Sequence, residues 1–326
     1  MRAIQMSNFG EADVLRLTEV SVPEPGPGEV RVRLHYAGIN PAETYIRTGN
    51  YAFYKPELPY IPGFDGAGEV DAIGEGVIRL RPGDRVFVAS LLAKRKTGTY
   101  AEFVVCDANV VHHLPDNISF AQGAAMGVPG HTAHRALFQR AHLQPGETVL
   151  IHGASGGVGS LAVQMARAHG AYVIGTAGNE EGLALLEKLG VHAAFNHADP
   201  AHFEAILAHT QGAGVDVIIE ALANVNLEHD AEILAMFGRI VVVGNRGSIN
   251  FTPRHLMVKE SAVLGMAIWN SPLAEYTASL AAMAAGLESG VLRPVVGREY
   301  DLADAAQAQI DILKHSARGK MVLKVL

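Results

Sequence analysis

The sequence predicts an α/β protein with two domains, an antiparallel β domain and a doubly wound parallel sheet. Residues 1 to about 120 are rich in short β-branched runs separated by Gly and Pro, a pattern typical of antiparallel strands. From about 123 to 266, apolar strands alternate with helical segments, which indicates βαβ units. The 326 residues also exceed the roughly 150 residues of an average domain.

Strands are expected in the first part wherever a β-branched run lies between turn residues. These runs cover residues 30–34, 68–72, 84–89 and 100–105.

The middle part contains six apolar runs that we expect as parallel strands. They cover residues 148–152, 172–176, 193–196, 215–220, 240–244 and 262–265. A helix is expected over about 180–189, because Asn179 is a suitable N-cap and Gly190 follows its end.

In the segment after residue 266, the sequence predicts one long helix after Leu273 and a closing strand over 321–325 that returns to the first domain. We therefore expect residues 1–122 and 267–326 to form one domain and residues 123–266 to form the other.

The segment from Thr148 to Gly159 predicts a buried strand, a glycine-rich turn and a helix start. Glycines at 153, 156 and 159 allow a tight turn, close approach of the backbone to phosphates, and close packing of the helix on the strand. The helix that follows directs its N–H groups at the anion. This geometry is typical of a dinucleotide-binding Rossmann domain.

Composition excludes several classes of function. A net charge of −7 and a pI near 6.1 argue against a broad nucleic-acid footprint. The single cysteine, Cys106, excludes an internal disulfide and a Cys-rich metal cluster. No apolar stretch of about 18 residues occurs. We expect a cytoplasmic protein without membrane contact.

Several motifs resemble a known family. They are Gly-Ile-Asn-Pro at 38–41, the segments 62–68 and 82–86, the glycine turn, and the stretches 40–47, 175–182, 223–227 and 242–247. Together they resemble the medium-chain dehydrogenase/reductase superfamily, and within it the zinc-free, zeta-crystallin-like quinone oxidoreductases. The resemblance implies a GroES-like catalytic domain beside the Rossmann domain. The basic loop 91–96 is a local departure from the family pattern.

No metal site is expected. The resemblance implies that Asn40 stands where zinc-dependent relatives carry a cysteine, and that Phe64 and Asp65 replace the segment with the histidine ligand. His131 and His134 lie one helical turn apart, with no third ligand near them in the sequence.

The expected cofactor is NADPH. The position about 20 residues beyond the glycines, which carries an acid in NAD-specific folds, is occupied here by Gly178 and Asn179. Glu180 and Glu181 would repel a phosphate if they turned inward, but first-turn acids complement the helix dipole.

The resemblance adds further residues to the expected cofactor site. The full set is Tyr45, Ser155, Gly156, Gly157, Val158, Gly159, Gly178, Asn179, His197, Asn226, Val243, Gly244, Asn245, Arg246, Met266, Ala267, Ile268 and Arg318.

Hydride transfer requires orientation and exclusion of water more than a strong acid. Quinone oxygens become anionic during reduction, so hydrogen-bond donors stabilise them. Asn40 and Tyr45 are the candidate donors, with Tyr51 as a pocket wall. Two simpler interpretations stay open: Tyr45 as a half-buried aromatic and Asn40 as a turn residue before Pro41.

The leading hypothesis is an NADPH-dependent quinone oxidoreductase acting on a quinone or another small electrophile. One alternative is a zinc-free reductase of enone or enal double bonds. Another is a non-catalytic protein that binds NADPH and RNA, which the Lys94-Arg95-Lys96 loop leaves open; DNA is not an expected partner. The strands at 240–244 and 262–265, near the predicted sheet edge, favour a homodimer or homotetramer.

Overall fold

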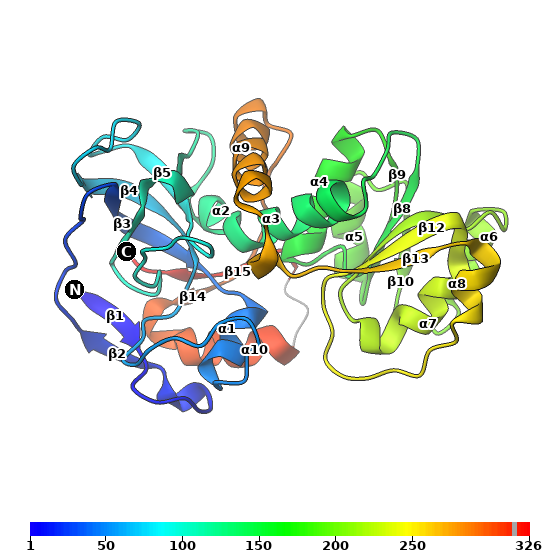
Figure 1. The fold of residues 1–326 in the computed structure, drawn as a ribbon, viewed down its shortest axis with the longest axis horizontal. Coiled ribbons are helices and arrows are strands. Elements are labelled where there is room, and N and C mark those ends of the chain that lie inside the picture. The colour runs from blue at the N-terminus through cyan, green and yellow to red at the C-terminus, as the bar shows by residue number, and fades with distance from the viewer. Residues whose placement is uncertain (315–317) are drawn as a thin grey trace. The chain divides into compact units, whose positions relative to one another are not determined.

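The computed structural model describes residues 1–314 and 318–326. The described chain divides into two compact units (Figure 1). The first unit contains Met1–Pro129 and Leu280–Leu326, and the second contains Gly130–Ser279. The domain limits expected from the sequence stay a prediction. The strand expected near the end of the chain does belong to the first unit.

The first unit is built around a sheet in the order β14-β15-β3-β4-β5-β7, with β6 paired to β3. The strands of that sheet are β3 (Glu29–Gly38), β4 (Asp65–Ile73), β5 (Arg85–Ala89), β6 (Phe103–Asp107), β7 (Val111–His113), β14 (Val296–Asp301) and β15 (Lys320–Lys324). Strands β1 (Arg2–Gln5) and β2 (Arg16–Glu19) form a separate two-stranded sheet. All of these pairs are antiparallel except β14 with β15. The expected antiparallel β domain is confirmed. One pair at its edge, β14 with β15, is parallel, because helix α10 carries the chain across between these two strands.

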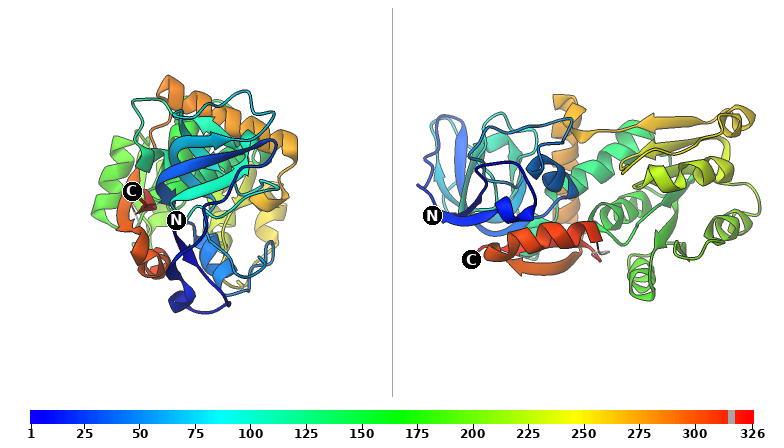
Figure 2. Two further views of the ribbon diagram at one scale, coloured as in Figure 1. Left: turned by 90° about the vertical axis from the view of Figure 1, so that its left-hand side faces the viewer. Right: turned by 90° about the horizontal axis from the view of Figure 1, so that it is seen from below.

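Short helices cover this sheet. They are α1 (Pro41–Arg47), α2 (Phe120–Ala124) and α10 (Ala305–Lys314), while α3 (Gly127–His134) and α9 (Leu273–Ser289) cross from one unit to the other. Helix α10 packs against α1 and against the short helix at Ala12–Val14, so C-terminal and N-terminal segments lie side by side (Figure 2).

The second unit is a six-stranded parallel sheet in the order β10-β9-β8-β11-β12-β13, the strand order of a Rossmann domain. Its strands are β8 (Thr148–Ile151), β9 (Tyr172–Ala177), β10 (Ala193–Asn196), β11 (Val215–Glu220), β12 (Leu234–Val242) and β13 (Ala262–Gly265). Its helices are α4 (Gly157–Ala168), α5 (Glu180–Lys188), α6 (His202–His209), α7 (Ala223–Ile233) and α8 (Arg254–Lys259). Buried Leu150, Ile174, Ile218 and Ile240 form the centre of its core.

Strand β12 begins earlier than the sequence predicts, at Leu234 and not at residue 240. Its first half contains exposed Met236 and Phe237, and Phe237 has a φ of 61°. Because Gly238 and Arg239 interrupt the apolar run, sequence periodicity identifies only the second part of the strand.

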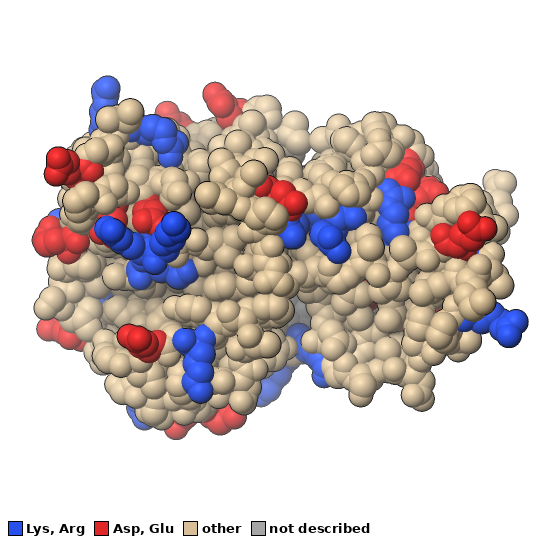
Figure 3. Space-filling model, viewed as in Figure 1, with Lys and Arg blue, Asp and Glu red and all other residues tan. Residues whose placement is uncertain are grey.

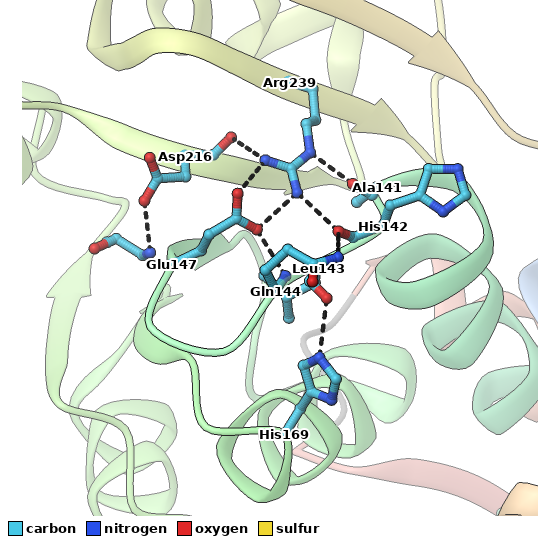
Figure 4. Close-up of polar contacts among 9 residues, drawn as sticks. Ala141, His142, Leu143, Gln144, Glu147, His169, Asp216 and Arg239 are labelled. Carbon is cyan, nitrogen blue, oxygen red and sulfur yellow. Dashed lines mark hydrogen bonds and ion pairs between the residues drawn. The ribbon is translucent and has the colours of Figure 1, made fainter.

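Arg239 of β12 binds the segment before β8 and the backbone of β11 (Figure 4). Arg239 of β12 donates to both carboxylate oxygens of Glu147, each at 2.7 Å, and to the carbonyl of Ala141 at 2.6 Å. The Asp216 carboxylate of β11 accepts from the N–H of Thr148 at 2.8 Å. These bonds hold the amino ends together, at the opposite edge from the carboxyl ends where parallel sheets bind ligands.

No helix in the described part of the chain is long and apolar enough to cross a membrane. On the face shown in Figure 3, acidic and basic side chains are interspersed.

Candidate cofactor and substrate sites

The glycine turn between β8 and α4 has the backbone geometry that the sequence predicts. Gly153 has a φ of +59°, which side-chain-bearing residues rarely adopt. A Cβ added to Gly159 would lie 2.5 Å from the Cα of Ala154, so only glycine lets the helix pack this closely. Gly156 is the N-cap of α4. The first N–H groups of a helix have no intrahelical partner, so this turn can receive an anion.

The residues after β9 form a second part of the expected cofactor site. Asn179 caps α5 as predicted, since its side-chain oxygen accepts from the N–H of Gly182 at 2.8 Å. A Cβ on Gly178 would lie 2.7 Å from Nε2 of His197, so the glycine and the imidazole are neighbours. Glu180 and Glu181 lie exposed in the first turn of α5.

A buried polar cluster, which sequence reasoning missed, lies beneath the glycine turn. His152 Nε2 lies 2.8 Å from Asp230 Oδ1 and 3.6 Å from Glu220 Oε2, and the three side chains are almost fully buried. Burial raises the pKa of Glu220 and of Asp230 to about 7, and lowers that of His152. The members come from β11, α7 and the end of β8, so their spacing in the sequence gives no sign of the contact.

The ligand atoms of this cluster lie within 4.8 Å of one another, as do those of Glu228, Glu232 and His255. Ion pairs between a histidine and a carboxylate join the members within each grouping.

Thr176 connects the buried cluster to the expected cofactor site. Its hydroxyl lies 3.4 Å from Nδ1 of His152 and 3.3 Å from Nδ1 of His197, and it accepts from the N–H of Gly153 at 3.1 Å. A single buried hydroxyl thus contacts both the glycine turn and the histidine beside Gly178.

The other expected cofactor residues of the second unit follow the carboxyl ends of β11, β12 and β13. Asn226 donates to Glu220 at 3.1 Å, and the N–H groups of Val243 and Gly244 donate to the Glu220 carbonyl. A Cβ on Gly244 would lie 2.2 Å from the Ala221 carbonyl, so this crossing requires glycine. Asn245 and Arg246 follow the carboxyl end of β12, and Met266, Ala267 and Ile268 follow that of β13.

In the first unit, Asn40 lies in a second buried cluster. It is 2% exposed, and its amide nitrogen donates to Glu43 at 3.1 Å and to Asp65 at 2.9 Å. The amide oxygen accepts from the ammonium of Lys320, which also pairs with Asp65 at 3.3 Å. Tyr100 donates to Glu43 from the other side.

The electrostatics of this second cluster follow from its burial. Burial raises the pKa of Glu43 to about 7, raises that of Asp65, and lowers that of Lys320. Asn40 and Asp65 belong to the two segments that, by the resemblance, carry zinc ligands in other members. Here the amide oxygen of Asn40 and the carboxylate of Asp65 instead bind the ammonium of Lys320.

Tyr45 and Tyr51 lie near each other at a partly exposed surface of the first unit. Their rings are 6.3 Å apart and nearly parallel, and Tyr51 contacts Phe53 edge-on at 5.4 Å. Asn40 differs from them, because both hydrogens of its amide are already donated within the protein. Arg318, the remaining expected cofactor residue of this unit, is exposed.

Sequence reasoning found Asn40 but missed Glu43, Tyr100 and Lys320. One signal was available: Asn40 and Glu43 have the spacing of a capping box at the start of α1. Lys320 contacts Asn40 across 280 positions of the chain, which no local pattern reveals.

Comparisons with known proteins agree with this architecture. Residues 26–116 match the alcohol dehydrogenase GroES-like domain and residues 157–285 match the zinc-binding dehydrogenase family. A quinone oxidoreductase of Rattus norvegicus is 46% identical and one of Homo sapiens 44% identical, each over 99% of this chain and 97% of the relative. Among solved structures, an NAD-dependent alcohol dehydrogenase has a TM-score of 0.91 at 31% identity, covering 100% of both chains. A mycobacterial protein complexed with NADPH has a TM-score of 0.87 at 28% identity, again covering 100% of both chains.

Proposed function

This chain belongs to the zeta-crystallin-like quinone oxidoreductases of the medium-chain dehydrogenase/reductase superfamily, and from this premise we propose that it reduces small quinones with NADPH in preference to NADH. The preference for NADPH is inferred from the residues that follow β9. Asn179 stands where NAD-specific folds carry an acid, and its side chain is engaged in capping α5. His197 lies beside Gly178, where it can donate to a 2′-phosphate. The NADPH-complexed neighbour supports the same choice.

NADPH, when bound, supplies the hydride for quinone reduction. Residues of the second unit would hold it: the N–H groups at the start of α4 would bind the pyrophosphate, and Gly178, Asn179 and His197 the 2′-phosphate. Met266, Ala267 and Ile268 follow β13 and would line the nicotinamide end.

In the first unit we assign Tyr45 as the donor to the quinone oxygen and Tyr51 as the wall against which the quinone ring packs. A phenol hydroxyl placed where charge develops stabilises the reduced oxygen. Tyr45 lies on α1, whose start is fixed by the Asn40–Glu43 capping box. We therefore assign Asn40 as a positioning residue, because its amide is fully bonded inside the cluster.

We also propose that the reaction is independent of zinc, that the protein acts in the cytoplasm, and that it is a homo-oligomer. The ammonium of Lys320 supports the first point, since a cation already occupies the cluster around Asn40 and Asp65. The buried, unpaired Cys106 is consistent with a reducing compartment. Enone reduction and RNA binding are not favoured, because the full-length relatives carry the name quinone oxidoreductase.

The test follows cofactor absorbance on metal-free protein with 9,10-phenanthrenequinone, with NADH and an enone run in parallel. We expect turnover with NADPH and quinone, and a higher kcat/KM for NADPH than for NADH. Tyr45→Phe should lower kcat roughly ten- to a hundredfold through loss of one donor. Tyr172→Phe, which removes a surface hydroxyl of β9, should retain the rate. Turnover with the enone alone, or dependence on added zinc, would contradict the proposal.

A further inference from the structure

The first unit contains a cavity of about 500 Å³ that none of the assigned site residues line. Its lining includes Tyr54, Lys55, Glu57, Tyr60 and Lys96. A volume of this size accommodates a small organic ligand of two or three fused rings. The walls combine aromatic rings with cationic side chains, so the cavity favours a ligand that is both aromatic and negatively charged.

Lys96 brings a half-buried cation to this cavity. It comes from the basic loop 91–96, the segment where the sequence departs from the family pattern. Its ammonium donates to the carbonyl of Leu91 at 2.5 Å, and it lies 5.5 Å from the ring centre of Tyr54 and 5.3 Å from that of Phe64. Burial lowers the pKa of Lys96 to about 8, which leaves most of the side chain charged at neutral pH.

The remaining polar groups of the cavity also favour an anion. Burial raises the pKa of both Tyr54 and Tyr60, so their hydroxyls stay protonated and can donate. Lys55, an exposed lining residue whose ammonium lies 5.1 Å from the ring centre of Phe9, adds a second cation, against the single carboxylate of Glu57. Among the side chains that line the cavity, two cations therefore face one carboxylate. The Tyr54 ring, 6.3 Å from that of Tyr60, provides an aromatic surface for a planar ligand.

The cavity and the second buried cluster, which positions Tyr45, are linked through two consecutive residues of the chain. Phe64 contacts both Tyr54 and Lys96, and the next residue, Asp65, binds Asn40 and Lys320. We propose that the cavity is a binding site for an aromatic anion, and that it gives the enzyme a preference for quinones that carry a sulfonate or carboxylate. The second part of this proposal rests on the proposed function, whereas the first does not.

Calorimetric titration with 2-naphthalenesulfonate, which has no quinone group to reduce, tests the site directly. We expect Lys96→Gln and Lys55→Gln each to weaken binding roughly tenfold, because each removes a charged donor. Lys94→Gln, a change in the same loop but outside the cavity lining, should bind like the wild type. Thermal unfolding of each variant verifies that it is folded. Equal binding by the wild type and both cavity variants, or no binding by the wild type, would overturn the proposal.

A kinetic comparison tests the substrate preference. We expect the ratio of kcat/KM for phenanthrenequinone-2-sulfonate to that for 9,10-phenanthrenequinone to fall roughly tenfold in Lys96→Gln, and to stay at the wild-type value in Lys94→Gln. An unchanged ratio in Lys96→Gln would reject the preference while leaving quinone reduction established. Absence of turnover with both quinones would instead reject the proposed function, and the calorimetric result would still decide whether the site exists.

Discussion

At the scale of single residues, the second buried cluster depends on one cation. Lys320 is 5% exposed and contacts Asn40 and Asp65, while Glu43 lies close enough to affect its pKa. Each carboxylate would be costly to bury alone, because a buried charge without a partner loses its hydration. Lys320 therefore stabilises the segment that carries Tyr45 without contacting that side chain.

Replacing this lysine should destabilise the protein. We expect Lys320→Met to lower the free energy of unfolding by about 3–5 kcal/mol, since it leaves Asp65 buried without its cation. Denaturant unfolding measures the loss. Lys324→Met on the same strand is the matched control, because Lys324 is exposed, and it should lie within about 0.5 kcal/mol of the wild type. A similar small effect for both changes would show that the cation is dispensable.

Individual site residues were only partly predictable from the sequence. Gly153, Gly159 and Asn179 follow from local rules, since a positive φ, a close helix approach and an N-cap each act within a few residues. Lys320 and Glu220 do not, because their partners are brought together only by the folded sheets. The sequence predicts the segments of the candidate site but not which polar groups bond to one another within the buried clusters.

At the scale of elements, β10, β11 and β13 lie where their apolar runs predict. The edge strand β14 was missed, because its residues are mostly exposed and charged and give no apolar alternation. Strands buried on both faces have a strong hydrophobic signal, whereas edge strands are defined mainly by backbone pairing with a neighbour.

The cluster of His152, Glu220 and Asp230 joins three elements and should make stability depend on pH. The two carboxyl groups have a pKa of about 7 in the folded protein and a lower one when unfolded, so the folded state binds more protons. Their contribution is present at low pH and is lost as pH rises through 7. The lowered pKa of His152 acts in the opposite direction, but only below its ordinary value of 6.5.

We therefore expect the free energy of unfolding to fall between pH 6.5 and pH 8, and to fall less in Asp230→Asn. Denaturant unfolding at several pH values measures both slopes. Glu187→Gln, which removes an exposed carboxylate of α5, should keep the wild-type slope. Parallel slopes for the wild type and Asp230→Asn would remove the cluster as the cause.

At the scale of the whole molecule, the parallel sheet ends in a strand with one described partner. Strand β13 pairs with β12, and the N–H of Met266 donates to Val242. Backbone groups alternate in direction along a strand, so those of Val263 point away from β12. This edge can pair with the same edge of a second copy.

Light scattering at micromolar concentration should therefore give a dimer or a tetramer for the wild type. Val263→Pro removes an outward N–H without removing a bond to β12, and we expect it to shift the protein to the monomer. Circular dichroism verifies that the variant is folded. A wild-type protein that is monomeric under these conditions would contradict the pairing.

The path of the chain through the first unit has a consequence for synthesis on the ribosome. Strand β3, at residues 29–38, pairs with β15, at residues 320–324, so its sheet stays incomplete until residues 320–324 have been translated. The second unit is continuous from Gly130 to Ser279 and can fold as soon as it emerges. Strand β3 is synthesised before the second unit but completes its sheet only after it, and in the interval its unpaired edge needs protection from aggregation.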